Sequence, residues 1–174
     1  SAAEYFKNKN CKLQEADMRL LVYNTMKNPS PVRLFNIGIN YMQAGNLPKA
    51  DSLFQAYNTS FPDSIYGYSF RGRINYTLDT TMTVEPYITN MLQNYEKALT
   101  IAATDPVRFK SHGISAARTL AAYYVNIRSS RDTALSFVYK GLEIDSTDAS
   151  LKSIRDILEK ATPKQTSPVR SPAK

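Results

Sequence analysis

The amino-acid sequence predicts an all-α chain built from stacked antiparallel helix pairs. Equivalent residue types return after 34 residues, since Ala50 follows Ala16 and Phe54 follows Leu20 at this interval. Glycine and proline stand between the amphipathic segments. A period of about 34 residues with such breaks is typical of repeats that each contain two helices. Units of this kind bury their apolar faces by stacking, which predicts an elongated solenoid.

The clearest unit spans residues 31–63. Its first helix, over 31–44, places Leu34, Ile37 and Tyr41 on one face, with Gly38 between them. Its second helix, over 47–60, continues with Ala50 and Phe54 and ends before a proline at 62. Small residues at 38 and 50 are expected where the two helices cross closely, because a larger side chain would separate their backbones.

This order of residues resembles the tetratricopeptide repeat (TPR). The first helix of that family reads bulky-x-x-aliphatic-Gly-x-x-Tyr, and the second reads Ala-x-x-x-Phe before a proline. The resemblance covers residues 13–160. It implies a right-handed superhelical solenoid with a C-terminal capping helix, a role in protein–protein interaction and no enzyme activity. The chain also resembles C-terminal TPR regions of large Bacteroidota proteins, which implies a bacterial protein of the periplasm or cell envelope.

Residues 1–30 are interpreted as a partial first repeat. Residues 13–28 are predicted to be its second helix and residues 2–8 a remnant of its first helix, so the repeat is expected to be truncated. Ser30 is expected to cap the helix that starts at Pro31, since proline suits a first helical turn.

Residues 64–105 are predicted to form a divergent repeat. Tyr68 and Gly72 repeat Leu34 and Gly38, but Arg71 and Asn75 stand where Ile37 and Tyr41 stood. A long loop over 79–86 is expected to join its helices, and the second helix should run from about 86 to 104.

Residues 106–146 are predicted to form the last repeat. Asp105 is expected to cap its first helix, and Leu120, Ala121 and Tyr124 repeat the earlier spacing of Ile37, Gly38 and Tyr41. Residues 147–161 are predicted to form the capping helix, because the end of a stack needs a cover. Residues 162–174 are rich in Pro, Ser and Lys and are predicted to be a disordered basic tail.

The net charge of +7 does not point to nucleic acid. Four basic residues and no acid lie between Lys160 and the end, and the remaining surplus forms no stripe along one helix. No apolar run is long enough to span a membrane. The single cysteine, Cys11, allows no internal disulfide and is interpreted as a packing residue. No cofactor or metal is expected, and Asp145 and Asp148 are interpreted as helix caps.

In the TPR family the first helices line a concave groove, so the resemblance implies that partner-binding residues lie there. The carboxylate clamp of the chaperone-binding members is absent, since Phe35 and Ile39 occupy its positions. Arg73 and Arg118 are candidate anchors for acidic groups on a protein or peptide of unknown identity. The candidate partner-binding residues are Phe35, Ile39, Met42, Tyr66, Ser69, Arg73, Tyr76, Arg118, Val125 and Asn126.

Four alternatives stay open. Phe35, Ile39 and Met42 could pack only against neighbouring helices. The chain could be a purely structural C-terminal segment of a longer solenoid, with no ligand in this groove. His112, the only histidine, could serve a hydrolase, although no motif supplies a nucleophile or an orienting carboxylate. The basic tail could bind an anionic surface.

Overall fold

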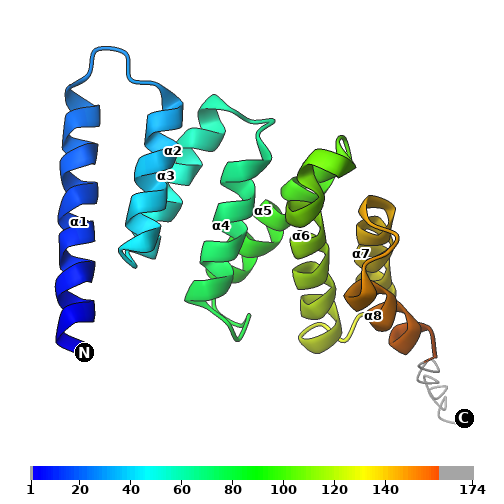
Figure 1. The fold of residues 1–174 in the computed structure, drawn as a ribbon. Coiled ribbons are helices and arrows are strands. Elements are labelled where there is room, and N and C mark those ends of the chain that lie inside the picture. Colours follow the sequence, from blue (N-terminus) through cyan, green and yellow to red (C-terminus); the bar gives the residue numbers. More distant parts are fainter. Residues whose placement is uncertain (1, 161–174) are drawn as a thin grey trace, which may run out of the picture.

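The computed structural model describes residues 2–160, which form eight α-helices and no strand (Figure 1). Consecutive helices pack as pairs, α2 with α3, α4 with α5 and α6 with α7, while α1 packs on α2 and α8 on α7. The helix bounds are α1 (Ala2–Thr25), α2 (Pro31–Gln43), α3 (Leu47–Ser60), α4 (Ile65–Leu78), α5 (Tyr87–Ala102), α6 (Pro106–Asn126), α7 (Arg131–Ile144) and α8 (Ala149–Lys160).

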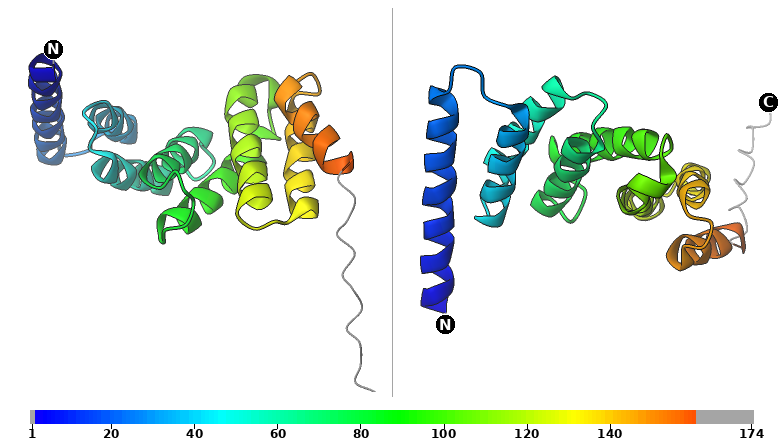
Figure 2. Two further views of the ribbon diagram at one scale, coloured as in Figure 1. Left: turned by 90° about the horizontal axis from the view of Figure 1, so that it is seen from below. Right: turned by 45° about the horizontal axis from the view of Figure 1, so that its top comes forward.

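The pairs follow one another along one direction, so α1 and α8 lie at opposite ends of an elongated molecule (Figure 2). The first helices of the pairs, α2, α4 and α6, face the viewer in Figure 1, and α3 and α5 pass behind them. The predicted all-α solenoid of stacked helix pairs is therefore confirmed.

The predicted helix starts and breaks are present at several points. The Ser30 hydroxyl accepts a hydrogen bond from the backbone N–H of Val32, and the Asp105 carboxylate accepts one from the N–H of Arg108 at 3.1 Å. Gly45 adopts a φ of 81°, which other residues rarely reach, and this lets α2 turn into α3 within a few residues. Local chemistry thus fixes where α2 ends and where α2 and α6 begin.

At the N-terminus the predicted boundaries are wrong. Ala2–Thr25 is one continuous helix, instead of a short remnant over 2–8 followed by a second helix over 13–28. No glycine or proline lies between residues 2 and 25, so nothing in this stretch interrupts the helix.

Small residues let the paired helices approach closely. A Cβ added to Gly38 would lie 2.9 Å from the Phe54 ring, and one added to Gly72 would lie 2.7 Å from the Tyr95 ring. Ala50 is fully buried at the same crossing as Gly38. The close helix crossing predicted at Gly38 is therefore confirmed, and the same arrangement recurs at Gly72: in the α2–α3 and α4–α5 pairs an aromatic ring packs against a glycine of the facing helix.

A carboxylate on the second helix of one pair holds the first helix of the next. The Tyr41 hydroxyl of α2 donates to Asp17 of α1 at 2.6 Å. One repeat later, Asn75 of α4 donates to Asp51 of α3 at 3.0 Å, and the Arg71 guanidinium pairs with the same carboxylate at 3.1 and 3.2 Å. Arg71 and Asn75 thus depart from the repeat pattern together because they share one half-buried acceptor.

The loop between α4 and α5 folds around Asp79. This buried carboxylate accepts hydrogen bonds from the N–H groups of Thr81, Thr83 and Val84 at 3.1, 2.7 and 2.6 Å. The Thr81 hydroxyl also donates to it, and these bonds lower the pKa of Asp79. The long loop is therefore held together by its own hydrogen bonds.

The last helix covers the end of the stack. Leu151 of α8 is fully buried and packs into the space above Gly141 of α7. Arg131 of α7 donates to the backbone carbonyl of Leu158 at 2.6 Å and ties the two helices together. These contacts agree with the predicted capping helix, whereas the predicted tail at 162–174 lies outside the described residues.

Candidate functional site

A row of aromatic rings runs from the C-terminal end of α3 across the N-terminal parts of the first helices α2, α4 and α6. Phe35 of α2 contacts Tyr57 at 5.0 Å and Tyr66 at 6.4 Å between ring centroids, and Tyr66 contacts His112 of α6 at 5.4 Å. Tyr57 contacts Phe61 at 5.1 Å. We call these rings the aromatic row. Its exposed members are Phe61 and Tyr66, so the row links the hydrophobic core to the surface. In order, the aromatic row consists of Phe61, Tyr57, Phe35, Tyr66 and His112.

Three of the predicted binding residues of α2 contribute to the core. Phe35, Ile39 and Met42 are half-buried and pack against the cluster around Phe54. Phe35 also contacts Phe70 of α4 at 5.5 Å, so α2 and α4 meet through apolar rings. The structure thus gives these residues the packing role that the sequence left open as an alternative.

The next junction is different, because α4 and α6 leave a cavity of about 190 Å³ between them. We call it the α4–α6 cavity. It brings together Ser69 and Arg73, both predicted binding residues, with residues of α5 and α6 that the sequence did not single out for binding. Its lining residues are Ser69, Phe70, Arg73, Tyr95, Ser111, His112 and Ser115.

The α4–α6 cavity carries one positive charge and no negative one. Arg73 is exposed, and none of the ion pairs within residues 2–160 involves it. No carboxylate lines the cavity. The Ser69 hydroxyl is buried and has no hydrogen-bond partner within the described part of the chain, which is costly unless a further group satisfies it. The cavity therefore offers donors to an anionic group.

The other titratable side chains of the cavity stay neutral near pH 7. Burial lowers the pKa of His112 below its usual 6.5, so the ring is uncharged. Burial also raises the pKa of Tyr95, whose ring covers Gly72. Arg73 is thus the charged group that sets the electrostatics of this cavity.

Arg118, the second predicted anchor, lies in different surroundings. Its guanidinium pairs with Asp148 at 2.5 Å, beside the pair of Lys110 and Asp145 at 2.8 Å. Lys110 and Thr147 hold the pKa of Asp145 at about 2. Both pairs fix α6 to the turn before α8, so Arg118 already has a carboxylate partner within the chain.

The remaining predicted residues are spread along the molecule. Tyr76 is half-buried near the end of α4 and packs against the central core cluster. Val125 packs beside Ala134 and Leu158, and Asn126 is exposed at the last residue of α6. The structure therefore brings together Phe35, Tyr66, Ser69 and Arg73, and leaves Tyr76, Val125 and Asn126 apart from them.

The sequence pattern did not single out the α6 side of the cavity. Ser111 and Ser115 lie four residues apart on one helical face, and His112 lies beside them. A polar i, i+4 pair at the start of a predicted first helix is the signal that marks this wall. This pair is difficult to recognise from the repeat pattern, because α6 has 21 residues and α2 has 13. Positions in α6 therefore cannot be matched to those in α2 by a fixed interval of 34 residues.

The cavity lacks the arrangement that nucleophilic catalysis requires. Within residues 2–160 His112 makes no side-chain hydrogen bond, and no carboxylate lies beside it to orient the ring. The same residues hold no cluster of three or more potential metal ligands. Over the described range, every helix is too short or too polar to cross a lipid bilayer. What the α4–α6 cavity supplies is a small, partly enclosed space with one positively charged side chain in its wall.

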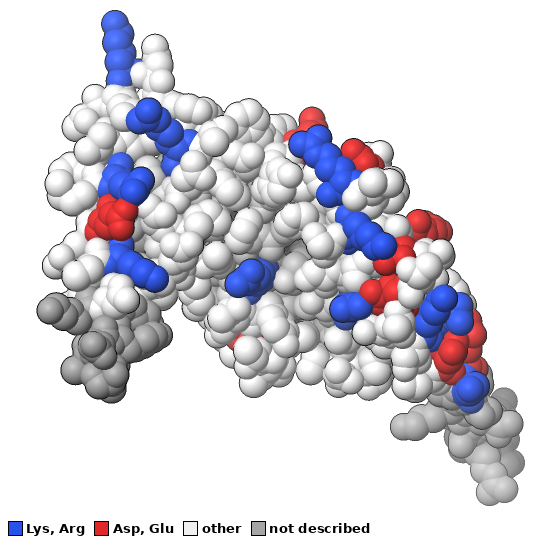
Figure 3. Space-filling view, in the orientation of Figure 1, with Lys and Arg blue, Asp and Glu red and all other residues white. Residues whose placement is uncertain are grey.

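Charge is distributed unevenly over the face formed by α2, α4 and α6. Charged side chains gather over α1 and α2 at one end and over α6 to α8 at the other (Figure 3). The central band between them is mostly uncharged apart from an isolated basic group. A partner that crosses this band meets a surface with few charges.

Comparison with known proteins supports the fold. No family model matches the chain, and no curated protein matches it. A similar solved structure is the C-terminal part of a TPR repeat-containing protein from Cytophaga hutchinsonii, with a TM-score of 0.65 and 23% sequence identity. The similarity covers 74% of this chain and 48% of that one, so the match spans about half of the solved chain. The chain therefore has a TPR-like helical solenoid fold.

Proposed function

We propose that this protein is a non-enzymatic interaction module that binds a segment of a partner protein across the first helices. The segment packs apolar side chains on the exposed rings of the aromatic row and places one acidic side chain in the α4–α6 cavity. The observation that carries the proposal is the cavity itself, in which Arg73 has no acidic partner within the described residues and the Ser69 hydroxyl is unsatisfied.

Comparison of two first helices supports the importance of this cavity. Ser69 and Arg73 of α4 occupy the repeat positions that Phe35 and Ile39 occupy in α2, 34 residues earlier. The apolar pair fills its junction, whereas the polar pair leaves space and charge. Polar residues that contribute little to packing, placed at the centre of a largely uncharged face, favour a role in recognition.

The size of the cavity favours a single side chain as its occupant. Pockets for small molecules usually span about 300–1,000 Å³, whereas this cavity measures about 190 Å³. One aspartate or glutamate side chain fits such a volume and can accept hydrogen bonds from Arg73 and the surrounding hydroxyl groups. Tyr66 is exposed and its ring contacts His112 of the cavity wall, so it is suited to contact the apolar residue next to that acid.

A displayed library of random peptides tests the proposal, because it needs no knowledge of the partner. We expect the wild-type protein to select peptides with an acidic residue beside an aromatic or aliphatic one. Arg73→Gln should weaken the selected peptides at least tenfold, which corresponds to about 1.4 kcal/mol. Tyr66→Ala should weaken them as well.

Arg128→Gln is the matched control, since Arg128 is also exposed but lies beyond the end of α6. It should leave binding unchanged. Selected peptides without acidic residues, or equal binding by Arg73→Gln, would refute this use of the cavity.

A second candidate is a purely structural role as the C-terminal segment of a longer solenoid. It is favoured by the packing of Phe35, Ile39 and Met42 into the core, which leaves these first-helix residues little freedom to bind. It predicts that the library yields no peptide dependent on Tyr66 or Arg73.

A further inference from the structure

Helix α1 takes the place of a second helix, and within residues 2–160 no first helix pairs with it. Ala16 of α1 and Ala50 of α3 are both fully buried. Asp17 bonds to α2 through Tyr41 as Asp51 bonds to α4 through Asn75. Helix α1 therefore packs on α2 in the way that α3 packs on α4.

At the α3–α4 junction, α2 fills the space between the two helices. Phe35 of α2 contacts Tyr57 of α3 at 5.0 Å and Phe70 of α4 at 5.5 Å. Tyr57 is buried as a result, and so is Leu53 one turn before it. A first helix is thus the element that covers both walls of such a junction.

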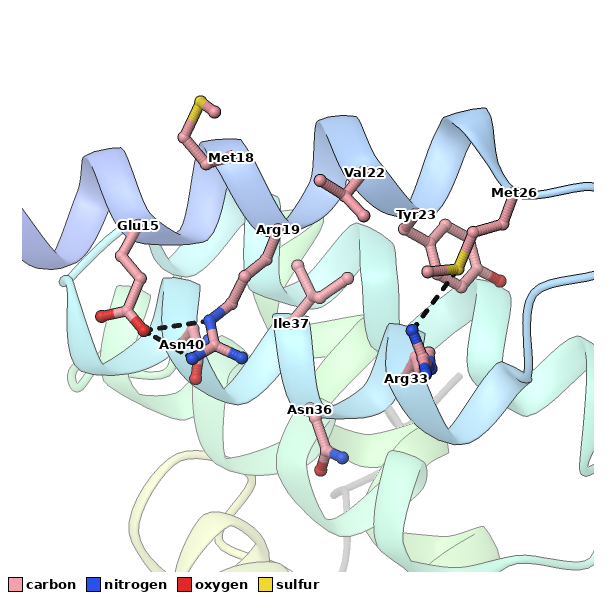
Figure 4. Close-up of a pocket in the computed structure, with 10 residues that line it drawn as sticks. All are labelled: Glu15, Met18, Arg19, Val22, Tyr23, Met26, Arg33, Asn36, Ile37 and Asn40. Carbon is pink, nitrogen blue, oxygen red and sulfur yellow. Dashed lines mark hydrogen bonds and ion pairs between the residues drawn. The ribbon is translucent and has the colours of Figure 1, made fainter.

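At the α1–α2 junction the corresponding space is open to the surface. Tyr23 and Asn36 stand at the positions of Tyr57 and Phe70, and both line a groove of about 640 Å³ (Figure 4). Arg19, at the position of Leu53, is exposed, whereas Leu53 is buried. We call this space the α1–α2 groove. Its lining residues are Glu15, Met18, Arg19, Val22, Tyr23, Met26, Arg33, Asn36, Ile37 and Asn40.

The walls of the α1–α2 groove combine apolar and basic side chains. Met18 and Val22 are 60% and 50% exposed, and Met18 points away from α2 (Figure 4). Arg19 pairs with Glu15 at 2.6 Å. The Arg33 guanidinium contacts the Met26 sulfur at 3.5 Å and has no carboxylate partner within residues 2–160. The net positive charge favours an acidic occupant.

The side of the α1–α2 groove that α2 forms is polar, and this favours a partner that binds reversibly. At the next junction, α4 presents Phe70 and Ile74 toward its neighbours, both of them apolar. The equivalent residues of α2 are Asn36 and Asn40, which line the groove. Permanent interfaces are more apolar than reversible ones. The groove therefore has the shape of a helix site and the chemistry of a reversible interface.

We propose that the α1–α2 groove binds an acidic amphipathic helix of a partner protein, in the position that α2 takes against α3 and α4. The apolar face of that helix covers Tyr23 and Val22, and an acidic residue on its edge pairs with Arg33. This site is separate from the α4–α6 cavity, and neither proposal depends on the other.

A fluorescently labelled peptide based on the sequence of α2 tests the proposal. The probe has the sequence of residues 30–44 with Arg33→Glu and Gln43→Glu, which keeps the apolar face of α2 and adds two acids. We expect wild-type protein to bind it with a Kd of about 100 μM or better in fluorescence anisotropy. A second peptide that also carries Leu34→Asp and Gly38→Asp should not bind, because its apolar face is broken.

Protein variants locate the site. Val22→Asp should weaken the probe at least tenfold, whereas Ile157→Asp, which adds the same charge at an exposed apolar residue of α8, should not. Arg73→Gln should bind the probe like wild type, which separates this site from the α4–α6 cavity. Absence of binding at about 1 mM protein, or equal binding by Val22→Asp, would overturn the proposal. So would a wild-type dimer in light scattering that Val22→Asp makes monomeric, because the groove would then belong to a second copy.

Discussion

The α2–α4 and α4–α6 junctions both lie between first helices of neighbouring pairs, but the first is filled by side chains and the second holds a cavity. At the first, Phe35 and Phe70 contact each other at 5.5 Å and fill the space between the helices with their rings. At the second, Ser69 takes the position of Phe35, Ser111 lines the wall from α6, and a cavity of about 190 Å³ remains beside Arg73. The comparison teaches that the repeat brings the first helices together, while the side chains at each junction decide whether the space between them is filled or left open.

Among the substitutions that compare the two junctions, truncation of Phe35 should cause the largest loss of stability. Phe35→Ala removes a ring that contacts Phe54, Tyr57 and Phe70, and it should lower the free energy of unfolding by about 3 kcal/mol. Denaturant unfolding measures this value. A loss below about 1 kcal/mol would mean that Phe35 is a surface residue available for binding and that the α2–α4 junction does not depend on it.

Removal of the Asp51 carboxylate should cause the second largest loss of stability. Asp51→Ala leaves Arg71 and the buried Asn75 without their shared acceptor, which should cost about 2–3 kcal/mol of stability. Asp156→Ala is the control, since its pair with Arg155 is exposed and should contribute less than about 1 kcal/mol. Similar effects of the two substitutions would show that Asp51 does not hold α4 in register.

The sequence could predict part of this structure and not the rest. The positions of Gly38, Ala50 and Gly72 follow from the repeat, because only small residues allow the observed helix crossings. The continuity of α1 does not follow from the repeat pattern, which predicts a break, but from the absence of any helix breaker between residues 2 and 25. The α4–α6 cavity could not be located beforehand, because its walls come from different repeats and α6 is longer than the pattern requires.

A smaller effect concerns the pH dependence of stability. Burial lowers the pKa of His112, so the unfolded chain binds a proton at this residue more readily than the folded protein does. Stability from this group is complete above pH 6.5 and is lost as the pH falls from 6.5 toward the lower folded pKa. Thermal unfolding between about pH 7 and pH 5 should therefore show a smaller decrease in Tm for His112→Gln than for wild type. Parallel curves would contradict the burial of this ring.

The smallest effect should come from Ser69. Its hydroxyl is buried without a partner in the described part of the chain, so Ser69→Ala should change stability by no more than about 0.5 kcal/mol or increase it slightly. The same substitution should weaken an acidic peptide that reaches the cavity. A loss of stability of more than about 1 kcal/mol would mean that Ser69 supports the packing of α4, as Phe35 supports that of α2.

The most direct measurement follows the NMR signal of the His112 ring, which is unambiguous because the chain contains one histidine. Wild-type protein is titrated with N-acetyl-glutamate amide and, as a neutral match, N-acetyl-glutamine amide. If the α4–α6 cavity accepts an acidic side chain, the glutamate compound alone should shift the signal in a saturable way and raise the pKa of His112, and Arg73→Gln should abolish both effects. An unchanged signal, or an equal response to both compounds, would contradict the assignment of this cavity to recognition.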